Sequence, residues 1–254
     1  MNLRGEVRRA ARIAGFGALT AAMLPAFMAH RRLSLERQRD GVRRRWVGAW
    51  SGALLGMFGV RAIIQGAPPA PGPGRLVAAN HRSTADILLL LQTFGGHMVS
   101  RADLAGWPLV GAAARSVGTL FVDRSSASSG ATAVRTIRTR LVAGDTVIVF
   151  PEGTTFPDDE VRPFHAGAFV AAARSDAEVI PVGLAYQRGS GAAFVNESFA
   201  AHLSRMAAAP PSRVALCIGE PIPVSRTRAS DLRDAAHTEV QRLVRDARAL
   251  VDRD

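Results

Sequence analysis

The sequence has few of the residues that bind metals or nucleic acids. Its one cysteine, Cys217, excludes an intramolecular disulfide, and no Cys/His set has the spacing of a metal site. Because Cys217 lies in an apolar run, we expect it to be a packed core residue. Aromatic residues make up 6% of the chain, and no Gly-x-Gly-x-x-Gly or Walker motif follows a strand. These absences argue against a nucleotide-binding fold, a metalloenzyme and a nucleic-acid-binding module.

Lysine is also absent: arginine supplies all 32 basic residues, against 21 acidic ones, and the formal net charge is +11. Residues 1–45 contain eleven Arg and three acidic residues, so +8 of this charge lies in that segment. A basic arm can bind nucleic acid. Here the Arg clusters flank apolar stretches, which favours an anionic membrane surface as the partner instead.

Two uncharged stretches lie within this basic segment. Residues 13–29 number about 17, the short limit for a membrane span, and Pro25 would kink their helix. Residues 46–60, about 15 in number with Trp46 and Trp50 at one end, are too short for an upright span but suit a membrane interface. We predict a helical hairpin that dips into one leaflet. A single true span and a hairpin packed on the soluble core are the alternatives.

A linker separates this segment from the rest of the chain. Residues 66–74 contain four Pro and three Gly, a composition that forbids regular structure. We therefore predict an N-terminal hairpin at residues 1–65 and one folded domain at 75–254, long enough to bury a full core.

Apolar strands and helices alternate in that domain, which predicts an α/β fold with a mostly parallel sheet flanked by helices. We predict strands at residues 97–100, 119–122, 146–150, 179–185 and 214–218, and helices at 108–116, 130–142, 166–174 and 232–251.

The most informative stretch is Leu76–Leu91, where one apolar run ends in Asn80-His81 and a second begins after Asp86. The first run suits a buried strand and the second a helix. His81 would then lie at the C-terminal end of a strand, where open α/β sheets bind ligands, with Asp86 near enough to hold its imidazole. A carboxylate on one ring nitrogen prepares the other as a general base for a substrate hydroxyl. Ser83-x-x-Asp86 is also a capping box, so Asp86 can instead serve only to begin the helix.

Three more segments stand at predicted strand ends. Arg124 follows residues 119–122 and can grip a phosphate or carboxylate, or merely pair with Asp123. Phe150–Thr155 forms a tight turn whose N–H groups can face an anion. Its Glu152 either takes part in the site or makes a structural salt bridge. Pro181 interrupts another strand, which indicates a bulge or edge beside a ligand, or a plain strand.

The remaining histidines are scattered through the sequence. Besides His30 in the N-terminal segment, they are His97, His165, His202 and His237. We expect His202 and His237 to lie at the surface.

Together, the four segments resemble the glycerolipid acyltransferase family, that of 1-acylglycerol-3-phosphate O-acyltransferases. The family's blocks are N-H-x4-D, G-x-x-x-[IV]-x-R, F-P-E-G-[TS] and an apolar run that ends in P-[VI]. In this sequence they are Asn80–Asp86, Gly118–Arg124, Phe150–Thr155 and Val179–Val182, in the family's order. The similarity covers roughly residues 60 to 220.

The resemblance implies an O-acyltransferase. His81 would deprotonate an acceptor hydroxyl, which attacks an acyl thioester, and Asp86 would orient His81. The donor would be acyl-CoA or acyl carrier protein, with no cofactor or metal. The resemblance also implies that the N-terminal helix pair rests on the cytoplasmic leaflet of the inner membrane. The residues expected to bind the acceptor are Asn80, Arg101 (where many members have Lys), Arg124, Glu152, Gly153 and Thr154.

Two departures from the family bear on the acceptor. The resemblance first implies 1-acyl-sn-glycerol-3-phosphate, which would give phosphatidic acid. However, Thr155 stands where many phosphate-using members have Arg, and His165 where Lys is frequent. Each lost bond to phosphate is worth about 1.5–3 kcal/mol. A lyso-ornithine lipid, which has no phosphate, is therefore the alternative acceptor, although Arg101 and Arg124 keep the phosphate acceptor open.

An alternative of another class is a non-catalytic, lipid-binding membrane module with the same fold. The presence of both His81 and Asp86 argues against it.

Overall fold

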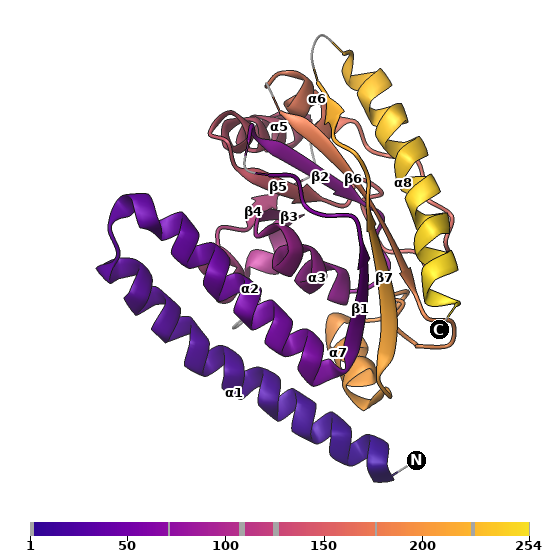
Figure 1. The fold of residues 1–254 in the computed structure, drawn as a ribbon. Helices are drawn as coiled ribbons and strands as arrows, with labels where there is room; N and C mark the ends of the chain where they lie inside the picture. Colours follow the sequence, from indigo (N-terminus) through magenta and orange to yellow (C-terminus); the bar gives the residue numbers. More distant parts are fainter. Residues whose placement is uncertain are drawn as a thin grey trace.

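A computed structural model of the chain describes residues 3–70, 72–106, 110–123, 127–175, 177–224 and 227–253. Within them, one sheet of eight strands has the order β1-β7-β6-β2-β5-β3-β4, with β8 beside β6 (Figure 1). The strands are β1 (Val60–Gln65), β2 (Arg75–Ala79), β3 (His97–Arg101), β4 (Leu120–Val122), β5 (Thr146–Val149), β6 (Glu178–Tyr186), β7 (Ser212–Ile218) and β8 (Ile222–Pro223). The helices are α1 (Leu3–Leu33), α2 (Arg39–Phe58), α3 (Ala85–Phe94), α4 (Val110–Ser116), α5 (Ala127–Val142), α6 (Gly167–Ala173), α7 (Phe199–Ala208) and α8 (Ala229–Val251), with short 3-10 turns η1 (Glu36–Gln38) and η2 (Ala102–Gly106).

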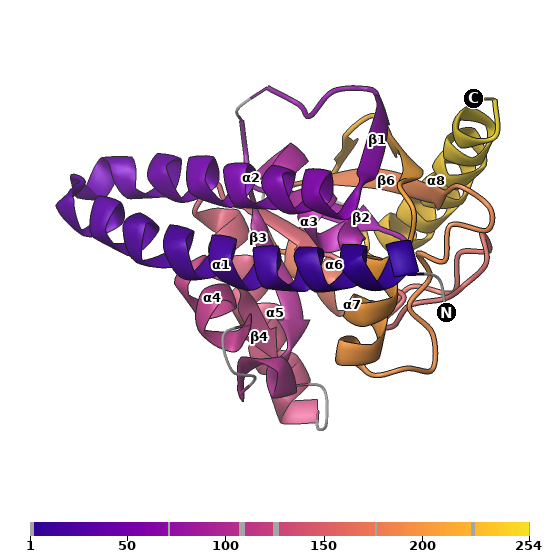
Figure 2. The same cartoon turned by 90° about the horizontal axis from the view of Figure 1, so that it is seen from below.

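The sheet is mostly parallel, as predicted; β6 runs antiparallel to β7 and β8. Successive residues of β2 enter different apolar clusters: Leu76 and Ala78 pack in one, Val77 and Ala79 in the other. α5, α6 and α8 cover the first face, and α2, α3 and α7 the second (Figures 1 and 2). Both faces are covered, which explains why the strands are apolar without alternation. The predicted helix at 108–116 is seen as α4, and its first two residues lie outside the described part.

The predicted helical hairpin forms from α1 and α2, which lie side by side in both views (Figures 1 and 2). The indole N–H groups of Trp46 and Trp50 do not mark a free end: they donate to His30 Nδ1 (3.0 Å) and Thr20 Oγ1 (3.1 Å) of α1. α1 is long and apolar enough to cross a membrane by length and composition. The division of the chain into hairpin, linker and domain stays a prediction.

The last residues of the predicted N-terminal segment 1–65 belong to the sheet. Val60–Gln65 forms edge strand β1, parallel to β7. Their side chains are largely exposed, so the sequence lacks the apolar run that marks a buried strand.

Two arginines attach α1 to α7. Arg12, which is 8% exposed, donates to the carbonyls of Met206 (3.5 Å), Ala207 (3.3 Å) and Ala209 (2.7 Å). Arg8 donates to Ala208 O at 3.2 Å. The last carbonyls of a helix have no partner within the helix and carry partial negative charge, so a guanidinium satisfies them well. The hairpin is therefore docked on the domain at both helices, because α2 also packs on α3.

Replacing Arg12 by methionine is expected to lower the free energy of unfolding by about 1.5–3 kcal/mol, the value for hydrogen bonds to a charged group. Urea unfolding in detergent, followed by tryptophan fluorescence, measures the change. Arg31→Met, at an exposed position near the other end of α1, is the matched control. Equal stability of the two variants would contradict the docking role of Arg12.

Three side chains outside the site test the remaining expectations. Cys217 is a packed core residue as predicted, and burial raises the pKa of its thiol to about 11. The surface prediction for His202 is wrong: α7 turns this side chain inward, where it is fully buried against Phe194. His237 is half-buried, with Nε2 at 3.0 Å from Val161 O.

Pro181 lies inside β6, opposite Ala78 of β2. On its other side β7 ends at Ile218 and β8 begins at Ile222, so this position faces a gap between the two strands. The Pro181 carbonyl accepts the N–H of Gly219 (2.9 Å) in that gap. A proline is tolerated there because no ladder bond needs its missing N–H.

Candidate active site

The site lies at the carboxyl end of β2, a central strand of the sheet. His81 is the second residue after β2, and β2 has β5 and β6 as its parallel neighbours. Because parallel strands end at the same edge, Glu152 after β5 and Tyr186 at the end of β6 arrive beside His81. This edge is where open α/β sheets bind ligands.

His81 and Asp86 form the predicted pair. His81 Nδ1 lies 3.0 Å from Asp86 Oδ2, and the carboxylate is fully buried. The imidazole stacks on Phe150, with ring centroids 3.8 Å apart and planes 6° from parallel. Its side chain is 16% exposed. Within the described residues Nε2 has no hydrogen-bond partner, so this nitrogen is the one left for a substrate proton.

Asp86 also ties down the start of α3. Its Oδ2 accepts the backbone N–H groups of Arg82 (2.7 Å) and Ser83 (2.8 Å), and Oδ1 accepts the Tyr186 hydroxyl (2.6 Å). The bond to Ser83 is half of a capping box. The two interpretations of the sequence are therefore compatible, because one oxygen holds both the helix start and His81.

Glu152 lies behind His81 rather than in front of it. Its buried carboxylate accepts the backbone N–H of His81 (2.7 Å) and of Arg162 (2.9 Å), and pairs with the Arg82 guanidinium at 2.9 Å. Both partners of this ion pair are nearly inaccessible to solvent. The structure thus has Glu152 in the structural salt bridge that the sequence left open.

Asn80 is fully buried, and its side-chain amide bonds the backbone of Leu184. Its Nδ2 donates to Leu184 O (2.9 Å), and its Oδ1 accepts Leu184 N–H (2.8 Å). The side-chain amide therefore joins β6 to the end of β2 in the way that a strand residue would. Its geometry favours positioning of His81 over contact with an acceptor.

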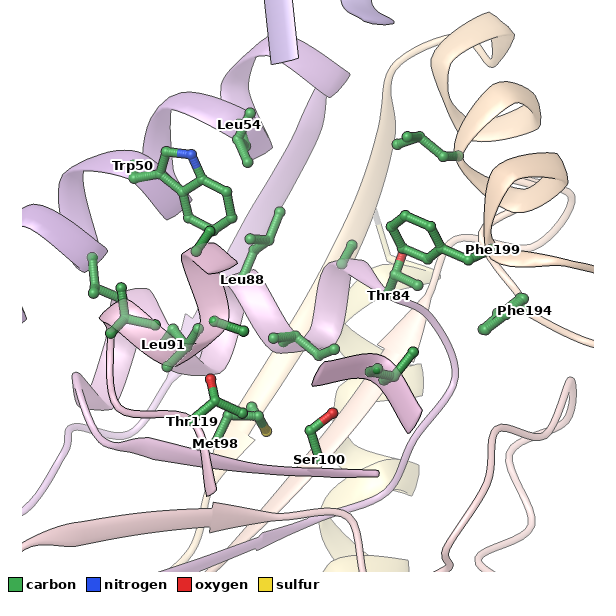
Figure 3. A pocket seen from close by; sticks show the side chains of 18 of the residues that line it. Trp50, Leu54, Thr84, Leu88, Leu91, Met98, Ser100, Thr119, Phe194 and Phe199 are labelled. Atoms are coloured by element: carbon green, nitrogen blue, oxygen red, sulfur yellow. The ribbon is translucent and has the colours of Figure 1, made fainter. Parts of the chain in front are cut away.

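A cavity of about 620 Å³ opens beside His81 and runs under the hairpin. Figure 3 shows side chains from α2, α3, β3 and α7 around it, among them Trp50, Leu88, Met98 and Phe199. Most of its lining is apolar. Among the residues predicted to bind the acceptor, Arg101, Gly153 and Thr154 line it, whereas Asn80 and Glu152 do not. Arg124 lies outside the described residues.

Few of the described residues that line the cavity are charged. Arg101 is exposed and donates to Asp103 through Nε (3.0 Å) and Nη2 (3.1 Å). Asp103 and Glu197 also line the cavity. Thr155 is part of the wall, with its hydroxyl bonded to Phe194 O, while the exposed His165 is outside the lining.

Comparison with known proteins identifies the family. The family model described as Acyltransferase matches residues 62–185. A lyso-ornithine lipid O-acyltransferase from Pseudomonas aeruginosa is 31% identical over 85% of this chain and 84% of its own length. The chain belongs to the lysolipid acyltransferase family.

Other members and one solved structure agree with this. A 1-acyl-sn-glycerol-3-phosphate acyltransferase from Neisseria gonorrhoeae is 30% identical over 59% of this acyltransferase and 58% of its own length. The crystal structure of the 1-acyl-sn-glycerophosphate (LPA) acyltransferase PlsC from Thermotoga maritima superposes with a TM-score of 0.77. It covers 96% of this chain and 98% of that one at 21% identity, which shows the shared fold.

Sequence analysis missed three residues of this acyltransferase that contact His81 or Asp86. Arg82 lies inside the first block but carries no sign of its partner Glu152. Phe150 opens the third block, and only the fold shows that it stacks on His81. Tyr186 could have been predicted from the sequence, because it is the single tyrosine of the chain and stands at the end of a strand, as the predicted site residues do.

Among the described residues, no group of three or more His, Cys, Asp or Glu side chains is arranged to hold a metal ion. The chemistry of the acyltransferase can be written with His81 and Asp86 alone. The absence of a cofactor stays a prediction.

Proposed function

We propose that this acyltransferase moves a fatty acyl group from acyl-CoA or acyl carrier protein to the hydroxyl of a lysolipid. The observation that carries the proposal is the His81 imidazole, held by Asp86 through Nδ1 and facing an apolar cavity with Nε2 unpaired among the described residues. A base so placed needs no protein nucleophile, because the attacking oxygen belongs to the acceptor.

The reaction follows from this geometry. As the acceptor oxygen attacks the thioester carbonyl carbon, its proton passes to His81 Nε2, and the buried Asp86 stabilises the imidazolium. The tetrahedral intermediate then collapses with cleavage of the C–S bond. The imidazolium returns its proton to the departing thiolate, which leaves an ester, a free thiol and neutral His81.

The hairpin gives the acyltransferase its place on a membrane in this proposal. Large apolar side chains of α1 are exposed along its outer side, namely Leu3, Val7, Ile13, Met28 and Leu33. The Arg-rich turn beside them suits the anionic head groups of the cytoplasmic leaflet. α1 is attached to α7 and α2 to α3, so the hairpin lies along the domain, which supports insertion into one leaflet over an independent span.

The acceptor that best suits the cavity is a lyso-ornithine lipid. Its head group carries one carboxylate and one ammonium, and its free hydroxyl lies on the amide-linked acyl chain. Among the described residues of the cavity lining, the cation Arg101 is paired with Asp103, and the carboxylate of Glu197 is paired with Arg205. This lining supplies no unpaired cation for a phosphate dianion and suits a zwitterion better. The relative from Pseudomonas aeruginosa, which aligns over most of both chains, bears the corresponding name. The second candidate, 1-acyl-sn-glycerol-3-phosphate, is supported by Arg101 at the cavity and by the relative from Neisseria gonorrhoeae.

Acyl transfer from oleoyl-CoA to the two acceptors, measured side by side with detergent-solubilised protein, tests this. We expect kcat/KM for the lyso-ornithine lipid to exceed that for 1-acyl-sn-glycerol-3-phosphate by about tenfold or more, because unpaired charges at a site are costly. Thr155→Arg should shift the preference toward the phosphate acceptor, and Val142→Arg, on the exposed outer side of α5, should not. A preference of the wild-type enzyme for the phosphate acceptor would refute the assignment of a lyso-ornithine lipid as the acceptor.

A further inference from the structure

The Tyr186 hydroxyl makes a short, buried bond to the carboxylate that holds His81. Tyr186 ends β6, is 7% exposed, and places its oxygen 2.6 Å from Asp86 Oδ1. An ionised carboxylate only accepts hydrogen bonds, so the phenolic proton points to Asp86. Burial and the negative charge of Asp86 raise the pKa of Tyr186, which therefore stays protonated at neutral pH.

Asp86 does not need Tyr186 to stay in place. Two backbone N–H groups, from Arg82 and Ser83, already fix Oδ2 next to His81. The bond from the Tyr186 hydroxyl to Oδ1 instead changes how the negative charge of Asp86 is distributed, since a donor on one carboxylate oxygen draws charge away from the other.

That charge decides whether His81 can accept a proton. A carboxylate at one ring nitrogen stabilises the imidazolium, and a base that is already protonated cannot take the proton of a hydroxyl. Each donor to Asp86 weakens this stabilisation and so favours the neutral ring.

We propose that Tyr186 is a positioning residue that acts through Asp86 to set how readily the His81 imidazole takes up a proton. The inference rests on the proposed role of His81 as general base. Tyr186 itself touches no substrate in this scheme, because Asp86 stands between it and the imidazole.

The other charged groups near His81 and Asp86 have partners of their own or are disfavoured in their charged form, so Tyr186 is the group we expect to act on Asp86. Arg82 and Glu152, behind His81, neutralise each other. His202 of α7 lies near enough to Asp86 for the two groups to interact, and burial lowers the pKa of His202, which disfavours its charged form. Across the cavity, Arg101 is paired with Asp103.

Tyr186→Phe keeps the packed ring and removes the donor. We expect the acid limb of the kcat/KM profile, which reports the free enzyme, to move up by about half a pH unit. Activity on the acid limb then falls about threefold, while the alkaline plateau changes less than about twofold. Thr93→Val, which removes a hydroxyl bonded to Leu89 O at the other end of α3, should leave the limb in place. An equal loss of activity at every pH would show a structural role alone and overturn the proposal.

The single tyrosine allows a second test with the opposite sign. Biosynthetic incorporation of 3-fluorotyrosine changes only Tyr186, and the more acidic phenol donates a stronger bond. The acid limb should then move to lower pH. The His81 ring can be followed without substrate by ¹³Cε1 NMR, with the signal assigned by its loss in His81→Ala, and its titration midpoint should shift in the same two directions. Midpoints that do not move refute the inference, whereas a fully active His81→Ala would refute the proposed function itself.

Discussion

Replacement of His81 by alanine is expected to lower kcat for acyl transfer by about a thousandfold, within the range that a positioned general base contributes. The fold should survive, because the ring is at the edge of a cavity and Asp86 keeps three other donors. Release of free CoA from oleoyl-CoA in the presence of the lysolipid acceptor measures the rate. KM for the acceptor should change little, since the proton transfer is made in the transition state.

The control for this variant is His237→Ala, which removes a half-buried imidazole outside the cavity. Both variants should bind vesicles like the unmodified chain. Retention of more than a tenth of the activity in His81→Ala would contradict the mechanism and revive the non-catalytic lipid-binding module.

Loss of the Arg82 guanidinium is expected to be the most destabilising of the substitutions considered. Arg82→Met leaves the Glu152 carboxylate buried without its partner, and an uncompensated buried charge costs about 3–5 kcal/mol. The backbone of His81 would also be affected, because Glu152 holds its N–H. Urea unfolding in detergent gives the free energy, and a decrease below about 1 kcal/mol would show that solvent reaches the pair.

The double variant Arg82→Met/Glu152→Gln separates the two effects. It removes both charges, so it should recover part of the lost stability, as expected when the cost comes from the orphaned carboxylate. No recovery would mean that Arg82 acts through its bond to Glu160 O instead.

The sequence was most informative about those parts of the molecule whose structure follows from the local pattern of apolar and polar residues. The apolar runs that end at Asn80 and Phe150 are buried on both faces of the sheet, so both were recognised as strands. His81 was therefore placed correctly at the end of a strand. The short distance in sequence between His81 and Asp86 predicted that the two side chains pair. The direction of a side chain at a strand end depends on the neighbouring strands, which is why Asn80 and Glu152 were predicted to face the acceptor but lie behind the site. β1 was missed because its side chains are largely exposed. The burial of His202 was missed because a polar residue lies on the buried face of α7, next to Met206 and Ala207.

The attachment of α1 to α7 has a consequence for how the acyltransferase selects its fatty chains. Phe16 of α1 and Trp50 of α2 line the same cavity as His81. The segment that rests on lipid in our proposal is thus also a wall of the cavity beside His81, the space in which we expect the acyl chains to lie. A change that adapts α1 to a thicker or thinner bilayer also alters the room for a chain, so adaptation to a new membrane and choice of the lipids that build it fall on the same residues.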